Sequence, residues 1–382
     1  MRGALDGMRV VDMATVIAGP GAARHLADFG ADVIKVEPPA LDSLRRMGWT
    51  PPEGGDSYFW RIAGRGKRCI TLDLAREADL AVARALLHEA DVMVENMRPG
   101  KIERLGLDPV DLLAANPRLV IVRVTGFGQH GPYAQRPGFA SIAEAMSGFA
   151  ALLGDEGSAP LLPPVALTDE ITALAGAFAA LVAVRHADRT GRGQIVDVNL
   201  LESMLQVLGP LPSACAHLDY EQPRMGSRLP YTVPRGTYRC ADGRWMAVSA
   251  SSDTVAARFV EMLGLRDGGR FATFPDRVAH RDELEEAMTR WAAARTRDEA
   301  LAECARMDAA AAPVATMREV LADPHVREVG AIVEVDGVRM QGPIARLSET
   351  PGDIRGQGPA PDAHAAEIRR AAAAGSWPSR DA

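Results

Sequence analysis

Short apolar runs alternate with longer segments of helical spacing through the first two hundred residues. Strand-like runs occupy residues 8–13, 33–37, 70–74, 92–95, 119–125 and 194–198. Apolar positions at helical spacing occupy residues 22–29, 77–88, 141–153, 168–186 and 200–208. Near-continuous Val and Ile runs are typical of strands covered on both faces by helices. The alternation therefore predicts an α/β domain with a doubly wound parallel sheet.

The pattern changes after residue 208. Five prolines interrupt it between residues 209 and 234, a segment that we interpret as a linker. Residues 237–249 then predict a hairpin with Asp242-Gly243 as a type I′ turn. Helical spacing follows at 255–263, 281–293 and 297–307, which predicts a small α+β domain over 235–320. A second hairpin is predicted around Asp336-Gly337, and the last residues of a tail rich in Pro, Gly and Ala are expected to be mobile.

Composition narrows the class of protein. The 382 residues are 47% hydrophobic and 24% charged, which is typical of a soluble globular chain rather than a disordered one. A net charge of −7 predicts no general attraction to nucleic acid or to anionic lipid. Four cysteines lie far apart without a CxxC pair, and no leading apolar segment of the secretory type is present. The run 171–184 is shorter than the roughly 18 residues of a membrane span. We expect a cytoplasmic protein.

The first strand, loop and helix suggest a dinucleotide-binding turn, because Gly19-x-Gly21 follows a strand and Glu37 ends the next one. Arg24 occupies the place of the third glycine of that fingerprint, where a side chain should obstruct close packing of helix and strand. The alternative interpretation is an ordinary tight turn between strand and helix.

Asp169 directly precedes the apolar helix predicted over 171–184. A helix N-terminus stabilises negative charge, so we expect this carboxylate to stay ionised and to point into a cleft, as a nucleophile would. The alternative is structural, with Thr168 or Asp169 acting as a helix cap.

Basic residues gather in two stretches, 61–68 and 98–104, each next to a strand end where open α/β sheets bind ligands. Their Arg and Lys side chains are candidates for holding the phosphates of a nucleotide-like cofactor. The alternative interpretation is that these side chains are solvated charges of surface loops. The eight histidines show no spacing typical of a metal site, so no metal is expected.

Five segments, taken in order, resemble the class III (CaiB/BaiF-type) coenzyme A transferase family, which also contains the α-methylacyl-CoA racemases. They are VVDMATVIAGPGAARHLADFGADVIKVEPP (10–39), GRGKRCITLDL (64–74), ADVMVENMRPGKIERLGLDP (90–109), VTGFGQHGPYAQRPGF (124–139) and TGRGQIVDVNLLESML (190–205). PRGTYRCADGRWMAVS (234–249) resembles the opening of the family's small domain, so the resemblance covers nearly the whole chain.

The resemblance implies an architecture that composition does not show. A Rossmann-like large domain would combine residues 1–208, which bind CoA, with a return linker and C-terminal part over 321–382. The linker 209–234 and the small domain 235–320 would lie between them in the chain. Two subunits would interlock as an obligate homodimer.

The resemblance also implies the chemistry. The family's aspartate falls on Asp169, which would attack an acyl-CoA thioester and carry an aspartyl-CoA thioester before an acceptor acid takes the CoA. Acyl-CoA and a carboxylic acid would be the substrates, with no metal, nucleic acid or membrane involved. The positions that would bind CoA are Ile17, Ala18, Leu72, Asp73, Asn96, Met97, Arg98 and Arg104.

Three positions depart from well-studied members. Ile17 replaces a glutamine of formyl-CoA transferases, and Ala140 stands where many members carry an acid. The histidine of the racemase branch falls on Phe139, which cannot transfer a proton. The resemblance therefore favours a transferase, with racemase-type proton transfer and a non-catalytic CoA-binding protein as the alternatives.

Overall fold

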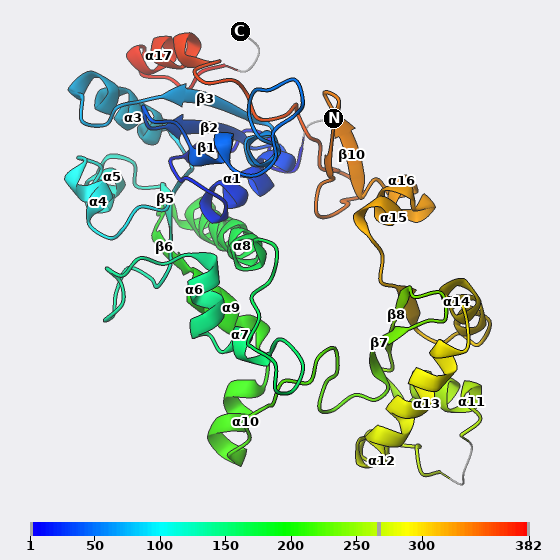
Figure 1. Ribbon diagram of the computed structural model, residues 1–382. Coiled ribbons are helices and arrows are strands. Elements are labelled where there is room, and N and C mark those ends of the chain that lie inside the picture. The colour runs from blue at the N-terminus through cyan, green and yellow to red at the C-terminus, as the bar shows by residue number, and fades with distance from the viewer. Residues whose placement is uncertain (1–2, 266–268, 380–382) are drawn as a thin grey trace. The chain divides into compact units, whose positions relative to one another are not determined.

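The computed structural model describes residues 3–265 and 269–379, and the chain divides into two compact units (Figure 1). The first unit combines Met1–Phe149, Pro163–Gly209 and His325–Ala382, so both ends of the chain contribute to it. The second unit combines Ala150–Leu162 with Pro210–Pro324. Residues 150–162, which the sequence analysis placed in the large domain, thus group with the second unit.

A parallel sheet of six strands forms the centre of the first unit's described part. The strands are β1 (Arg9–Asp12), β2 (Asp32–Glu37), β3 (Lys67–Thr71), β4 (Val92–Glu95), β5 (Val120–Thr125) and β6 (Ile195–Asn199). Their order is β3-β2-β1-β4-β5-β6, and Val10 of β1 pairs with Val33 of β2 on one side and Val92 of β4 on the other. This is the strand order of a doubly wound Rossmann-type sheet, so the predicted fold class is confirmed.

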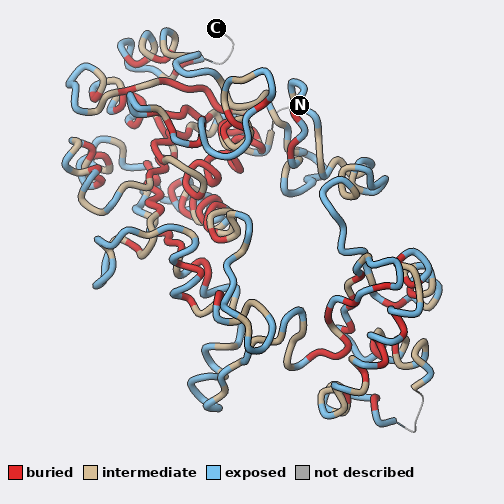
Figure 2. The backbone as a smooth tube through the Cα atoms, viewed as in Figure 1, coloured by how far each residue is buried: buried red, intermediate tan, exposed pale blue. Residues whose placement is uncertain are grey.

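Helices cover both faces of this sheet. Neighbouring residues of a strand point to opposite faces, so the strands contribute to two separate apolar cores. Val10 packs with apolar residues of α1 (Ala18–Asp28) and α8 (Leu167–Thr190). Val11 packs on the other face. The helices that contribute to that second core are α3 (Glu77–Glu89), α4 (Lys101–Arg104), α5 (Pro109–Ala115) and α17 (Ala365–Ala373). Figure 2 shows the buried strands between these helices.

Helix α8 is long and apolar enough to cross a membrane by length and composition alone. In the structure it packs along α1 and against β5 and β6, as a core helix of the first unit. Its alanines and Gly176 allow this close approach, since a Cβ on Gly176 would lie 3.2 Å from the Cβ of Ala22.

Helix α1 begins earlier than the sequence predicted. The helix was expected from residue 22, but it starts at Ala18 and includes Gly19, Pro20 and Gly21. A proline in the first turn costs no hydrogen bond, because the first helical N–H groups have no partner within the helix. The two glycines serve close packing, since a Cβ on Gly19 would lie 2.3 Å from that of Ala14, and one on Gly21 would lie 2.8 Å from that of Ala173.

Smaller elements complete the first unit. The helix predicted over 141–153 is divided at Gly148, whose φ of 90° ends helical geometry. The remaining described elements are η1 (Ser43–Arg46), α2 (Tyr58–Ala63), α6 (Ala140–Met146), α9 (Leu200–Val207), β10 (Ile332–Val335) and β11 (Val338–Gln341), with α7 (Phe149–Leu152) and α16 (Pro324–Glu328) at the junctions.

The second unit is a small α+β body with its own apolar core around Phe259, Met288 and Met246. Its antiparallel sheet contains β7 (Arg235–Arg239), β8 (Trp245–Ser249) and β9 (Ala311–Pro313). Its helices are α10 (Leu211–Leu218), α11 (Asp253–Met262), α12 (Phe274–Ala279), α13 (Arg281–Ala293), α14 (Arg297–Arg306) and α15 (Met317–Ala322). Helix α10 lies in the segment predicted as an irregular linker, with its prolines confined to the N-terminal end where they are tolerated.

The two Asp-Gly turns differ. The expected type I′ turn at Asp242-Gly243 is wrong, because only Gly243 has a positive φ and the loop is longer, with the N–H of Cys240 donating to the carbonyl of Arg244. The turn between β10 and β11 has positive φ at both Asp336 and Gly337, as a type I′ turn requires.

The C-terminal tail is partly ordered. Helix α17 buries Ile368 completely against the second core of the first unit. The predicted mobility concerned the last residues, of which 380–382 lie outside the described part of the chain.

Candidate active site

A cleft opens at the carboxyl-terminal edge of the parallel sheet, where doubly wound folds bind ligands. We call it the Asp169 cleft, and its volume is about 230 Å³. Its walls come from the loop after β1 (Thr15–Ala18), the loop after β4 (Asn96–Pro99), the end of β5 and the segment that carries Arg136 and Phe139. Asp169, on the first turn of α8, also lines this cleft. The prediction that Asp169 faces a cleft is consistent with this placement.

The electrostatics of Asp169 differ from the expectation. Burial, together with the nearby carboxylates of Glu170 and Glu144, raises the pKa of Asp169 to about 6. The helix N-terminus was expected to keep the group ionised by favouring its negative charge, but desolvation and like charges outweigh the helix and raise the pKa. A carboxylate with this pKa is ionised at neutral pH, yet it is a stronger base than an exposed aspartate.

The structural alternative for this position is also wrong. The N-cap of α8 is Ala166, and no side chain caps the helix. The Thr168 hydroxyl donates instead to Glu144, at 2.8 Å from its carboxylate oxygen, and both groups are buried. Asp169 is thus free of a capping role, while Thr168 fixes the buried Glu144 carboxylate nearby.

A second cleft lies along the same edge of the sheet. We call it the Leu72 cleft; its volume is about 480 Å³, and it is lined by the ends of β2 and β3 and by the loop after β4. The two clefts share Thr15, Asn96, Met97 and Arg98.

The predicted CoA-binding residues divide between these clefts. Ile17 and Ala18 line the Asp169 cleft, and Leu72 and Asp73 line the Leu72 cleft. Asn96, Met97 and Arg98 line both, so they lie where the clefts meet. Arg104 lines neither of them and sits at the end of the short helix α4. The structure therefore gathers seven of these eight residues along one edge, while their role in binding stays a prediction.

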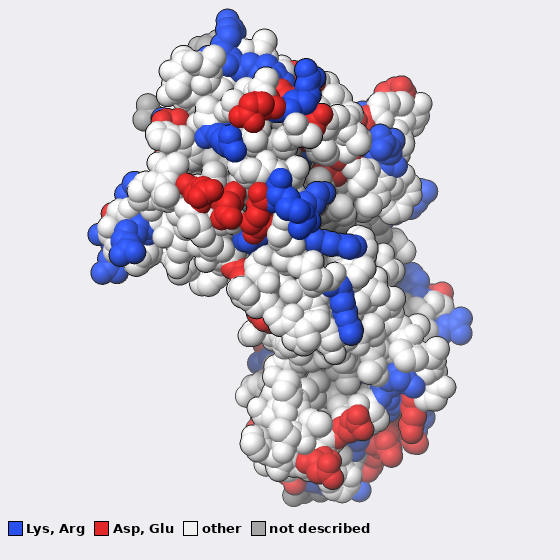
Figure 3. Space-filling model, turned by 90° about the vertical axis from the view of Figure 1, so that its left-hand side faces the viewer, with Lys and Arg blue, Asp and Glu red and all other residues white. Residues whose placement is uncertain are grey.

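The two basic stretches differ in burial and in their ion pairs. Arg65, Lys67 and Arg68 pair with buried or nearly buried aspartates, at 2.6 Å to Asp28, 2.8 Å to Asp12 and 2.7 Å to Asp32 respectively. They are neither phosphate ligands nor solvated loop charges, because β3 carries Lys67 and Arg68 into the protein interior and Arg65, just before this strand, is also buried. Arg98, Lys101 and Arg104 are exposed, and among the described residues none of the three has an acidic partner. In the described part of the chain, these three residues therefore leave unpaired positive charge at this edge of the sheet. Figure 3 shows that basic and acidic side chains are otherwise interspersed on the face that it draws.

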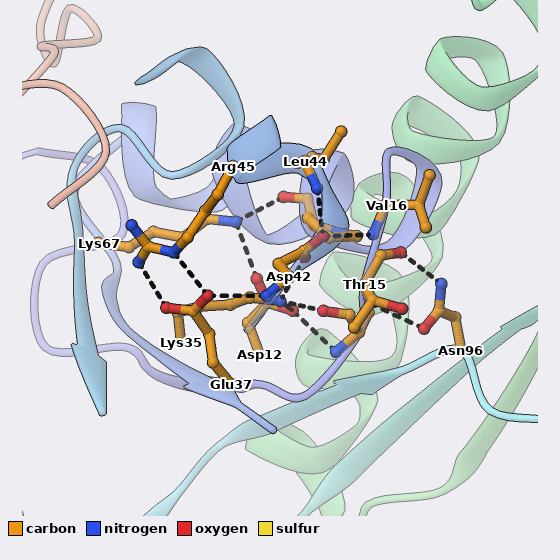
Figure 4. A network of polar contacts seen from close by, with 12 residues as sticks. Asp12, Thr15, Val16, Lys35, Glu37, Asp42, Leu44, Arg45, Lys67 and Asn96 are labelled. Carbon is orange, nitrogen blue, oxygen red and sulfur yellow. Dashed lines mark hydrogen bonds and ion pairs between the residues drawn. The ribbon is translucent and has the colours of Figure 1, made fainter. Parts of the chain in front are cut away.

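Asn96 has a role that spacing alone did not indicate. Its side-chain oxygen accepts the N–H of Thr15 at 2.9 Å, and its amide donates to the carbonyl of Thr15 at 2.6 Å. The side chain therefore ties the loop after β1 to the loop after β4 (Figure 4).

The sequence analysis missed several residues of the site. Arg136 lines the Asp169 cleft, with its guanidinium 3.9 Å from the centre of the Tyr133 ring. Asp12, Lys35 and Asp42 form a buried charged network behind the loop after β1 (Figure 4). Arg136 stands in a quoted family segment, so its charge was the available signal. The pairing within the network depends on three separate strands and loops, which no local pattern reports.

The cleft offers carboxylate and cationic chemistry. Asp169, Arg98 and Arg136 are the charged side chains that line it in the described part of the first unit, and no histidine is among those lining residues. Phe139 also lines it and is 64% exposed. No group of three or more potential metal ligands occurs within residues 3–265 and 269–379.

Comparison with known proteins gives consistent results. The model of CoA-transferase family III matches residues 5–365. The chain is 38% identical to the beta subunit of succinyl-CoA–L-malate CoA-transferase of Chloroflexus aurantiacus, over 95% of this chain and 93% of that one. It is 34% identical to succinate–glutarate CoA-transferase of Agrobacterium fabrum, over 94% and 92% of the two chains.

Solved structures agree with the sequence relatives. A CaiB/BaiF family protein from Brucella suis superposes with a TM-score of 0.86 at 33% identity, covering 97% of this chain and 100% of that one. Rv3272 from Mycobacterium tuberculosis superposes with a TM-score of 0.84 at 28% identity, covering 96% and 99%. With the family model matched over nearly the whole chain, this protein belongs to CoA-transferase family III and is an enzyme of the CoA-transferase class.

Proposed function

We propose that this enzyme moves CoA from an acyl-CoA to a free carboxylic acid through an aspartyl-CoA thioester on Asp169. The observation that carries the proposal is the position of Asp169, a partly buried carboxylate with a raised pKa in a cleft at the carboxyl edge of the sheet. Such a group is ionised at neutral pH and carries few water molecules to displace, as a carboxylate nucleophile requires.

The reaction needs four exchanges at three carbonyl carbons, those of the donor acyl group, Asp169 and the acceptor acid. A carboxylate oxygen of Asp169 attacks the thioester carbon, and the C–S bond breaks to give a mixed anhydride and CoA thiolate. The thiolate attacks the Asp169 carbonyl carbon, which releases the donor acid and leaves aspartyl-CoA. The acceptor carboxylate attacks that carbon, releasing the thiolate and forming a second anhydride. Thiolate attack on the acceptor carbonyl then gives the new acyl-CoA and restores the Asp169 carboxylate.

We further propose dicarboxylic acids as substrates, with a succinyl-type acyl-CoA as donor. Both enzyme relatives named above carry dicarboxylic acids in their names. A second carboxylate on the substrate needs a cation away from the reacting carbon. Arg136 supplies one in the Asp169 cleft, oriented by its contact with Tyr133. Guanidinium groups bind carboxylates in a bidentate manner, which favours this pairing over a neutral acyl chain.

CoA itself would occupy the shared edge of the two clefts. The residues proposed to contact it are Ile17, Ala18, Leu72, Asp73, Asn96, Met97 and Arg98, and Arg104 would meet its phosphates from outside the clefts. Asn96 would contribute mainly by holding Thr15 in place.

We also propose that the enzyme works in the cytoplasm as a homodimer. Helix α8 exposes an apolar stripe at helical spacing, made by Leu174, Phe178, Leu181 and Val182, with Phe178 70% exposed. Exposed apolar stripes of this kind favour association with another chain.

The test is CoA transfer from succinyl-CoA to a panel of dicarboxylic and monocarboxylic acids, followed by chromatography of the CoA esters. We expect transfer to dicarboxylic acids and a loss of at least about 10³-fold in kcat for Asp169→Asn. Exchange of the substrate's α-proton in D₂O without any acceptor acid would instead indicate racemase chemistry. Proton transfer of that kind needs two opposed acid/base groups, and Phe139 supplies none.

A further inference from the structure

The loop after β1 holds a residue in an unusual backbone conformation. Val16 has a φ of +68°, in the left-handed region that a β-branched residue rarely adopts. Val16 lines the Asp169 cleft, between Thr15 and Ile17, just before α1 begins. A backbone that is disfavoured locally persists only where surrounding contacts hold it.

Asp42 supplies that contact from a different part of the chain. Its Oδ1 accepts the N–H of Val16 at 3.2 Å and the N–H of Leu44 at 3.0 Å (Figure 4). The Asp42 side chain is completely buried, so water cannot replace it as the acceptor. The backbone of Asp42 is itself fixed, because its N–H donates to Glu37 at 3.0 Å.

Two buried lysines belong to the same network, Lys35 beside Asp42 and Lys67 beside Asp12. Lys35 Nζ lies 3.4 Å from Asp42 and 3.7 Å from Asp12, and it donates to the carbonyl of Ala14 in the same loop. Lys67 Nζ lies 2.8 Å from Asp12 and donates to the carbonyl of Pro20 in α1 at 2.7 Å. The N–H of Ala14 donates to Asp12 at 3.0 Å. The network thus holds the loop from Ala14 to the first turn of α1 by several independent bonds.

We infer that Asp42 is a positioning residue for the reaction: it holds Val16 in the left-handed conformation and so places the cleft wall from Thr15 to Ala18 opposite Asp169. Asp42 itself is not among the described residues that line the two clefts, so it would act on the reaction only through the loop. Its effect on catalysis rests on the proposed function, whereas its effect on the loop does not.

The first measurement follows the loop without any chemistry. Hydrogen–deuterium exchange of the peptide containing Val16 is compared in the unmodified protein and in Asp42→Ala. We expect faster exchange at the Val16 amide in the variant, with protection in β4 and α8 retained. Unchanged exchange at this amide would overturn the inference whatever reaction the enzyme performs.

The second measurement is a double-mutant cycle in kcat for CoA transfer. Asp42→Ala is expected to lower kcat by roughly 5- to 30-fold, the factor by which a residue with a Cβ disfavours the left-handed region. In the Val16→Gly background the same substitution should lower kcat by less than about threefold, because glycine adopts positive φ readily. A purely structural role predicts the opposite, since glycine adds backbone entropy to an already weakened fold.

Leu41 supplies the matched control. It also has a positive φ, of 62°, and is the neighbour of Asp42, but it lines neither cleft. The Leu41→Gly background should leave the effect of Asp42→Ala on kcat undiminished. Equal rescue by Leu41→Gly and Val16→Gly would contradict the inference, as would no rescue by either. If the unmodified enzyme transfers no CoA, the proposed function fails, and the exchange measurement still decides the role of Asp42.

Discussion

At the scale of single residues, the central feature is a carboxylate whose surroundings oppose its charge. Burial, together with the nearby carboxylates of Glu170 and Glu144, raises the pKa of Asp169 to about 6. A carboxylate with a raised pKa is more basic, and its ionised form is therefore a stronger nucleophile toward a thioester carbon. The cost of this arrangement is a loss of the reactive form in mild acid.

That cost leads to a pH prediction. Only ionised Asp169 can attack a thioester, so kcat/KM should fall about tenfold per pH unit below an apparent pKa near 6. Glu144→Gln keeps an oxygen for the Thr168 hydroxyl and removes a negative charge, so it should move the inflection to lower pH. The check is kcat/KM between pH 4.5 and 8 for both proteins, in the ~0.1 M salt range where buried charges are weakly screened. An inflection near 4 in the unmodified enzyme would contradict the assigned environment.

Arg136 leads to a prediction about specificity. Arg136→Ala removes the cation proposed to bind the distal carboxylate, so KM for a dicarboxylic acceptor should rise by roughly 10- to 100-fold. Lys101→Ala, which removes an exposed cation from the Leu72 cleft alone, is the control and should leave the ratio of dicarboxylic to monocarboxylic turnover unchanged. An equal loss for both classes of acid in Arg136→Ala would disprove the selective role.

Some of these residue properties could be predicted from the sequence, and others could not. Asp169 was found from its place before an apolar helix and from the family segments. The direction of its pKa shift was missed because tertiary packing decides its largest cause, burial, and also brings Glu144 close from 25 positions earlier in the chain. Arg65, Lys67 and Arg68 were misjudged for the same reason, since their aspartate partners come from α1, β1 and β2.

At the scale of elements, the hydrophobic pattern located the six strands of the sheet to within a few residues. The start of α1 was misplaced because a Gly-Pro-Gly sequence usually marks a turn, whereas here the two glycines allow contact with Ala14 and Ala173. Helix α17 was not predicted because Ile368 is its one large apolar residue, and this side chain is buried against the second core of the first unit. Tertiary contacts decide both cases.

The glycines of α1 lead to a stability prediction. Gly19→Ala would bring two Cβ atoms to 2.3 Å, so the loop or the helix must move, and the free energy of unfolding should drop by about 1–3 kcal/mol. Gly176→Ala in α8 is the matched control, because its Cβ meets that of Ala22 at 3.2 Å and alanine favours the helix by about 1 kcal/mol. Urea unfolding compares the two variants. A Gly19→Ala protein as stable as Gly176→Ala would show that the close approach is unimportant.

At the scale of the whole molecule, both ends of the chain build the first unit, while the second unit takes mainly the middle of the chain. Chain length alone suggests two domains but not that one of them is discontinuous. That feature came from the family resemblance, as did the expectation of an interlocked dimer. No periodicity along one chain reports a contact with a second one.

The apolar stripe on α8 allows the dimer to be tested. Phe178→Glu places a charge within the proposed interface and should shift the protein from dimer toward monomer or aggregate in sedimentation velocity. Val110→Glu, which changes an equally exposed residue on α5, is the control and should leave the sedimentation coefficient unchanged. A monomeric unmodified protein would contradict the proposed assembly.

The most direct test of the account is to capture the covalent intermediate during turnover. The enzyme is incubated with succinyl-CoA, quenched with hydroxylamine or borohydride, digested, and analysed by mass spectrometry. The account predicts modification of the peptide at Asp169, dependent on the donor and absent from Asp169→Asn. An unmodified Asp169 peptide in an enzyme that is turning over its donor would contradict the account.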